Sequence, residues 1–278
     1  MLKEIRVNFL IRYKNFTKSN LYCNLKKIRI LRKIKIGIGK ILWKYFPYKY
    51  RLHGDPILQK VFRLIGNEIN ASSIIETGTF LGASTSLMAE MFPNKKIYTG
   101  EINEKNYQKA LKKLKKYKNV KLFNEDSPTF LRKLFNEKLI GNMSLFFLDA
   151  HWLNNWPLED EIRIIGERIN HVVIFIDDFK VPNNPEFKFD FYENKECSLE
   201  LITPKFNKKR HYNILFPNYK HEQTMIDGKY HPQLVGYAII FQNMPDFFSK
   251  IKENKFIKKY FIDGSDLVSF KKLKLIKN

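Results

Sequence analysis

The chain has 278 residues, of which 44% are hydrophobic and 15% aromatic, enough for a substantial core and too many for a chain disordered throughout. Two cysteines exclude a disulfide framework and a four-cysteine zinc site. No apolar run approaches the ~18 residues of a transmembrane helix. Because basic residues also interrupt the first apolar run, no secretory signal is expected, and we predict a cytoplasmic protein.

The formal net charge of +22 is concentrated at the two ends of the chain. Residues 1–52 carry 15 Lys and Arg against one acid, residues 53–249 are nearly neutral at +2, and residues 250–278 carry +6. We therefore predict a globular domain over 53–249 between a basic N-terminal segment and a basic C-terminal extension. Lys outnumbers Arg 40 to 10, and since Arg is the better reader of phosphate, this bias disfavours a nucleic-acid partner.

The N-terminal segment contains an amphipathic pattern with lysines opposite an apolar face. The residues of that face are Leu31, Ile34, Ile38, Ile41, Leu42 and Tyr45. Such a helix could rest on an anionic membrane surface at the inner face of the membrane. The alternative is that it packs on the main domain or on a second subunit of a homo-oligomer.

From residue 57 onward, the pattern alternates between helical stretches and short β-rich runs. In chain order we expect a helix over 57–69, a strand over 73–76, a helix over 84–92, a strand over 96–100, a helix over 104–118, a strand over 120–124, a helix with Ser127 as its N-cap, a strand over 143–148, a helix over 159–169, a strand over 172–176, and an antiparallel hairpin of 212–216 with 234–241 at the sheet edge. The uniformly apolar strands 143–148 and 172–176 indicate burial on both faces. This predicts a doubly wound, Rossmann-like α/β sheet, mostly parallel, with helices on both faces.

In such a fold, ligands bind at the carboxyl ends of the strands. The first strand runs into Glu76-Thr77-Gly78-Thr79-Phe80-Leu81-Gly82, where two glycines permit a tight turn and close approach of a ligand. This is not the Gly-x-Gly-x-x-Gly pattern of a dinucleotide site. The preceding Glu76 would repel phosphate and suits a ligand that bears an amine.

Acids also follow the second and third strands. Glu101 is placed to accept hydrogen bonds from ribose hydroxyls, and Asp126 with Ser127 stands where a nucleobase edge would lie. The alternatives are a helix-preceding acid and a helix cap. Together with the loop from Glu76 to Gly82, this set resembles the class I S-adenosylmethionine-dependent methyltransferase superfamily over roughly residues 57–245.

That resemblance implies S-adenosylmethionine as the cofactor. Gly78 and Gly82, in the loop that also holds Thr77, would line its methionine and ribose, and Glu76 would reach its amino group. Glu101 would hold the ribose hydroxyls, and Asp126 and Ser127 would flank adenine.

A second group of acids follows the fourth and fifth strands, with Asp149 after one and Asp177 and Asp178 after the other. If these strands are neighbours, their ends lie ~5 Å apart. A hard divalent cation, Mg²⁺ above all, would relieve the repulsion, whereas the alternative is that each acid caps or pairs locally. His151, two residues beyond Asp149, is predicted to be a general base, with a structural role as the alternative.

This second group resembles the metal-dependent sugar O-methyltransferases of the macrocin O-methyltransferase family. Asp149, Asp177 and Asp178 fall on the metal positions of that family, and His151 stands where the family usually has Asp. The resemblance implies methylation of a hydroxyl on a sugar, glycan or similar small acceptor, with residues 179–230 as an acceptor-side insertion or lid. A nucleic-acid methyltransferase and a non-catalytic module that binds a membrane or a partner are the competing hypotheses.

Overall fold

The computed structural model describes residues 47–151, 156–192, 194–224 and 234–268. The predicted amphipathic helix of the N-terminal segment lies outside these residues. The chain divides into two units, Met1–Tyr50 and Arg51–Asn278, and the sheet belongs to the second. Within the described residues, no helix is long and apolar enough to cross a membrane.

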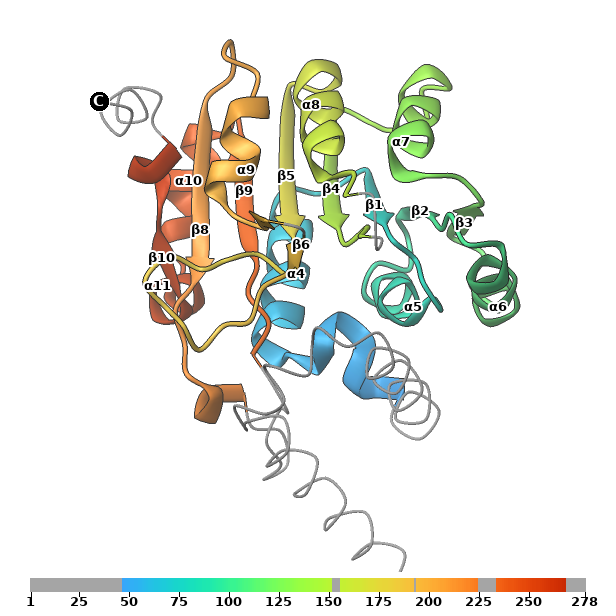
Figure 1. Ribbon diagram of the computed structural model, residues 1–278, viewed down its shortest axis with the longest axis horizontal. Helices are drawn as coiled ribbons and strands as arrows, with labels where there is room; N and C mark the ends of the chain where they lie inside the picture. Colours follow the sequence, from blue (N-terminus) through green and yellow to red (C-terminus); the bar gives the residue numbers. More distant parts are fainter. Residues whose placement is uncertain (1–46, 152–155, 193, 225–233, 269–278) are drawn as a thin grey trace, which may run out of the picture. The chain divides into compact units, whose positions relative to one another are not determined.

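The second unit is built on an eight-stranded sheet with the order β10-β8-β9-β5-β4-β1-β2-β3 (Figure 1). Its strands are β1 (Ser73–Thr77), β2 (Lys96–Gly100), β3 (Val120–Phe123), β4 (Met143–Leu148), β5 (His171–Ile176), β8 (Tyr212–Pro217), β9 (Ala238–Gln242) and β10 (Phe261–Asp263). The first five are parallel, and β9, β8 and β10 pair antiparallel in succession. The predicted α/β class and its antiparallel portion are confirmed. β9 inserts between β5 and β8, and β10 from the C-terminal extension forms the edge.

Helices connect the strands and lie along both sides of the sheet (Figure 1). They are α4 (Pro56–Glu68), α5 (Ala83–Met91), α6 (Glu104–Leu114), α7 (Ser127–Asn136), α8 (Leu158–Arg168), α9 (Leu199–Ile202), α10 (Pro245–Lys252) and α11 (Lys255–Tyr260). Short 3-10 segments are η1 (Pro47–Gly54), η2 (Thr203–Lys205), η3 (His221–Thr224) and η4 (Ser265–Val268), and a two-stranded ribbon pairs β6 (Phe191–Tyr192) with β7 (Lys195–Glu196).

Capping explains one difference from the sequence-based expectation. The N-cap of α7 is Asp126, not Ser127, because the Asp126 carboxylate accepts the backbone N–H of Thr129 at 3.1 Å. Ser127 is thereby the first helical residue, with Pro128 behind it, and its hydroxyl is released from capping. The helix predicted over 104–118 ends earlier, at Leu114.

The core lies on both faces of β4 and β5, whose apolar runs are buried as predicted. On one face, the ring of Phe62 from α4 packs edge-on against Phe147 and Phe175, with centroids 5.9 and 4.9 Å away. The sheet register aligns the last residues of β1 and β4, Thr77 with Leu148, and those of β4 and β5, Leu148 with Ile176. The residues that follow these three strands therefore emerge together at the point where the strand order reverses.

Candidate active site

The loop after β1 passes directly against the chain that follows β4. Gly78 has φ +83°, and a Cβ there would lie 2.3 Å from the carbonyl oxygen of Asp149, so a side chain is excluded. Gly82 has φ +69° and precedes α5. Phe80 adopts φ +50° with its ring 51% exposed. Gly78 thus permits close approach of two backbone segments, and Gly82 adopts a left-handed conformation beside the Leu114 side chain.

Glu76 is buried beneath this loop. Its Oε2 accepts hydrogen bonds from the hydroxyls of Thr85 at 2.5 Å and Thr99 at 2.6 Å. Burial raises the pKa of Glu76 to about 7, against the lowering effect of those two hydrogen bonds. One oxygen of the Glu76 carboxylate is therefore already hydrogen-bonded to residues of α5 and β2.

Glu101 follows β2 and is hydrogen-bonded to the loop between β1 and α5. Its Oε2 accepts the backbone N–H of Phe80 and its Oε1 that of Asn103, both at 2.7 Å. Burial raises its pKa, against these backbone hydrogen bonds. A carboxylate oxygen can accept more than one hydrogen bond, so Glu101 keeps capacity for a ligand hydroxyl.

A group of buried oxygens without hydrogen-bond partners lies where β1, α7 and α8 meet. Among the described residues these are the hydroxyls of Thr77 and Ser127 and both carboxylate oxygens of Glu161, a side chain that is 0% exposed. Burial raises the pKa of Glu161 to about 7, against the lowering effect of the nearby Ser127 and Thr77 side chains. The sequence analysis missed Glu161, although its position among Leu158, Ile162 and Ile165 on the buried face of α8 could have revealed it.

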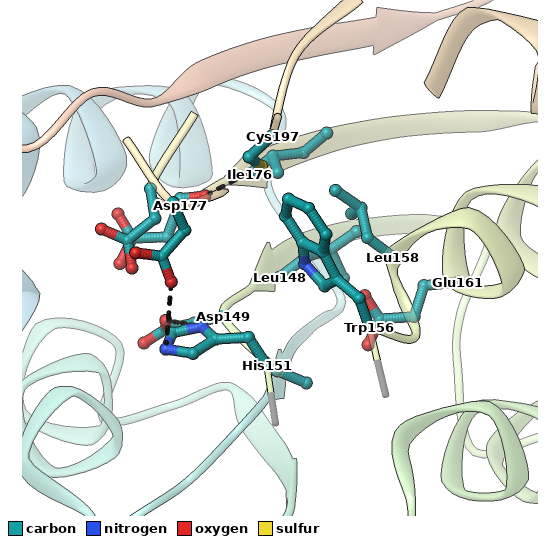
Figure 2. A pocket seen from close by; sticks show the side chains of 12 residues that line it. Leu148, Asp149, His151, Trp156, Leu158, Glu161, Ile176, Asp177 and Cys197 are labelled. Atoms are coloured by element: carbon teal, nitrogen blue, oxygen red, sulfur yellow. Dashed lines mark hydrogen bonds and ion pairs between the residues drawn. The ribbon is translucent and has the colours of Figure 1, made fainter. Parts of the chain in front are cut away.

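Beyond β4 and β5, two carboxylates and an imidazole converge (Figure 2). Asp149, His151 and Asp178 each offer one ligand atom, and these atoms lie within 4.8 Å of one another. Nδ1 of His151 is 3.7 Å from Asp149, and its Nε2 is 3.5 Å from Asp190, an acid that the sequence analysis did not select. The structure thus brings together Asp149, His151 and Asp178.

Asp177 stands apart from this group. Its Oδ2 lies 2.5 Å from Nε2 of His53, whereas its buried Oδ1 has no partner among the described residues. Burial disfavours the charged imidazole, but the charge of Asp177 and its hydrogen bond prevail and raise the pKa of His53 to about 9. The sequence analysis gave His53 no role, and because the partners are 124 positions apart no local pattern could have indicated one.

The acids at the ends of β4 and β5 repel one another. Burial, with the charges of Asp177 and Asp190, raises the pKa of Asp178 to about 7, and burial with neighbouring acids raises the pKa of Asp149 well above its usual value. Asp178 also holds φ +51°, a conformation that costs energy for a residue with a side chain. Clustered, desolvated carboxylates whose basic neighbours in the pocket lining are histidines match the oxygen donors that a hard divalent cation requires.

The pocket around these groups encloses about 250 Å³, including space open to solvent. Trp156 and Tyr192, with ring centroids 5.4 Å apart, stand beside it, and Trp156 is part of its lining. The Asp190 N–H donates to the carbonyl of Asp178 at 2.9 Å and so holds the β6–β7 ribbon at the pocket. Phe187, an aromatic residue of the predicted insertion, is buried against Tyr219 instead.

Part of the chain is similar to known proteins. Residues 70–155 match the model of a family described as putative methyltransferase. No curated protein matches the chain. Similar solved structures include an O-methyltransferase from Bacillus cereus in complex with SAH (16% identity, TM-score 0.45, 67% of this chain and 80% of that one). Two others are the O-methyltransferase TomG from Streptomyces achromogenes with SAM (15%, 0.45, 66% and 78%) and a putative caffeoyl-CoA O-methyltransferase from Staphylococcus aureus (14%, 0.44, 86% and 99%).

Because these structures share fewer than a fifth of their residues with the chain and all three TM-scores are below 0.5, no substrate is inferred from them. The family match covers β1 to β4, including the loop of Gly78, the acid Glu101 and the first residues of the acidic group. With the doubly wound sheet, this match indicates a methyltransferase fold over residues 70–155.

Proposed function

We propose that the protein is an O-methyltransferase that transfers the methyl group to a hydroxyl of a sugar, glycan or similar small acceptor, with the assistance of a divalent cation. One observation carries the proposal: two carboxylates and an imidazole converge within 4.8 Å at the ends of β4 and β5. They adjoin the β1 loop, since Gly78 packs against the backbone of Asp149. A proton-accepting group therefore stands next to the expected position of the methyl donor.

The cofactor would lie across the ends of β1, β2 and β3. Gly78 and Gly82 would shape the loop that lines it, and Glu101 would accept the ribose hydroxyls while it holds the loop through Phe80. Thr77, Asp126 and Ser127 would adjoin its adenosine part, and Glu76 would act from below the loop, on its amino group. At the ends of β1, β2 and β3, the residues of the chain would bind and orient the cofactor.

Mg²⁺ would be held by Asp149 and Asp178, whose oxygens lie in one group. Asp177, the third acid of the sequence-based set, would support the site through its bond with His53. When bound, the cation would lower the pKa of the acceptor hydroxyl and orient it. The residues present fit this role because they offer oxygen donors and lack a basic partner other than histidine.

His151 would accept the proton of that hydroxyl. It adjoins both Asp149 and Asp190, which stabilise the imidazolium that forms. As the oxygen–methyl bond forms, the bond between the methyl group and the sulfonium sulfur breaks, and the proton stays on His151. Asp149 is the second candidate for the base.

An acidic pocket disfavours a nucleic acid as acceptor, since phosphates would meet carboxylates. From its charge, we expect the basic segment 1–52 to contact anionic lipid peripherally. Co-sedimentation of the full chain with phosphatidylserine vesicles at low salt, lost at high salt, tests that contact, and equal sedimentation with neutral vesicles would contradict it.

The proposed reaction is tested with methyl-labelled S-adenosylmethionine, Mg²⁺ and a panel of sugars, glycans and small alcohols. We expect label on oxygen, identified by NMR of the product, and a loss of transfer in chelator that added Mg²⁺ restores. Label on nitrogen or carbon alone, or full activity in excess chelator, would contradict the proposal.

A further inference from the structure

The pocket carries more acid than the proposed reaction needs. Its lining includes five carboxylates and neither Lys nor Arg among the described residues. The five acids are Asp149, Glu161, Asp177, Asp178 and Asp190. A divalent cation would offset Asp149 and Asp178, and His53 offsets Asp177.

Asp190 and Glu161 remain after this pairing. The basic group that Asp190 meets is the ring of His151, 3.5 Å away, which the proposed mechanism uses for another purpose. Glu161 is fully buried, lines the pocket, and has no hydrogen-bond partner on either carboxylate oxygen among the described residues. Buried acceptors of this kind are costly unless a donor reaches them.

Aromatic rings stand beside the same acids. The ring centroid of Tyr192 lies 5.4 Å from that of Trp156 and 6.4 Å from that of His151. Figure 2 shows Trp156 and Glu161 at the same end of the pocket. Carboxylates next to aromatic faces bind organic ammonium groups, because the ring quadrupole and the negative charge both attract a cation and the carboxylate accepts its N–H donors.

We propose that the acceptor carries a protonated amine near the hydroxyl that is methylated, as in an amino sugar or an aminocyclitol, and that Asp190 and Glu161 select it. This inference rests on the proposed O-methyltransferase function. An ammonium group would donate hydrogen bonds to the two Glu161 oxygens, which meet no hydrogen-bond partner among the described residues. Phosphorylated and carboxylated acceptors are disfavoured because they would add negative charge to the pocket.

The test uses matched probes with the full-length protein, Mg²⁺ and methyl-labelled S-adenosylmethionine. Glucosamine is compared with N-acetylglucosamine, and 2-deoxystreptamine with myo-inositol, so that the two pairs distinguish a sugar from a cyclitol. We expect kcat/KM about 10- to 100-fold higher for the amine of the preferred pair, the size expected for a hydrogen bond to a charged group. Saturation-transfer NMR with S-adenosylhomocysteine measures binding preference if turnover is too slow.

Two isosteric variants and one control locate the recognition. Asp190→Asn and Glu161→Gln should each reduce the preference for the amine, and the larger loss marks the residue nearest the ammonium group. Asp160→Asn removes an exposed acid beside Glu161 that pairs with Arg163, and should keep the preference.

Each outcome has a distinct meaning. Equal kcat/KM and equal binding for both members of each pair, or an unchanged preference in both variants, would overturn the amine inference and leave O-methylation intact. Methyl label found on the amine nitrogen would overturn the proposed O-methyltransferase function while ammonium recognition stands.

Discussion

The two halves of the carboxyl edge treat their acids in opposite ways. At the ends of β1 and β2, Glu76 and Glu101 accept four hydrogen bonds from the chain's own hydroxyls and backbone amides. At the ends of β4 and β5, one oxygen of Asp177 accepts none from the described residues, and Asp149 and Asp178 crowd together. The first half is therefore preorganised, whereas the second, in our proposal, requires a cation from outside the chain.

The largest expected effect is the loss of that counter-charge. Excess chelator, or Asp178→Asn, should lower the methyl-transfer rate by about 10³-fold or more, since a Lewis acid contributes several kcal/mol to the transition state. Single-turnover assays with and without added Mg²⁺ measure it. Cofactor affinity, set by the other half, should change little. Unaltered turnover in chelator would show that the acids at the ends of β4 and β5 need no cation for methyl transfer.

A smaller loss is expected for His151→Ala, which we place at about 10²–10⁴-fold in rate, the usual contribution of a general base. The same variant separates the two roles open to this ring. A base leaves the affinity for Mn²⁺, measured by electron paramagnetic resonance, near that of the parent protein. A marked fall in Mn²⁺ affinity would make His151 a third ligand and move the base to Asp149.

A substitution at the ends of β1 and β2 should change the affinity for S-adenosylmethionine. Glu101→Ala removes the acceptor of Phe80 and the proposed contact with ribose, and should weaken S-adenosylmethionine binding by ~1–3 kcal/mol, the cost of hydrogen bonds to a charged group. Calorimetric titration gives the value. Glu104→Ala, which replaces an exposed acid of α6 paired with Gln108, is the matched control and should bind normally. Equal affinities in the two variants would remove Glu101 from the site.

Some features of the site could be predicted from the sequence, and others depend on tertiary packing. The strands, the glycine turn and the acids at strand ends are local features, and apolar runs with their flanking residues are enough to indicate them. His53 and Asp190 could not be found this way, because their roles come from packing. His53 meets an acid 124 residues away, and Asp190 reaches the pocket only because the β6–β7 ribbon lies there. Asp126 took the cap that Ser127 was expected to supply, a shift of one residue that propensity alone does not resolve.

The smallest expected effect concerns Glu161 and the stability of the ligand-free protein. Its pKa of about 7 in the folded state exceeds the ordinary value of 4.5, so between these pH values the folded protein keeps a proton that the unfolded chain has released. Stability contributed by this group is therefore present at low pH and is lost as pH rises through about 7. Glu161→Gln cannot titrate, so its Tm should equal that of the parent near pH 5 and exceed it near pH 8. We expect a gain of roughly 1–2 kcal/mol at the higher pH, less than the full shift implies because water can enter the pocket. Calorimetric scans of both proteins in chelator from pH 5 to 8 test this prediction. Parallel Tm curves would mean that the charge of the Glu161 carboxylate is already stabilised in the folded protein. Only the aspartates of the pocket would then lack such stabilisation.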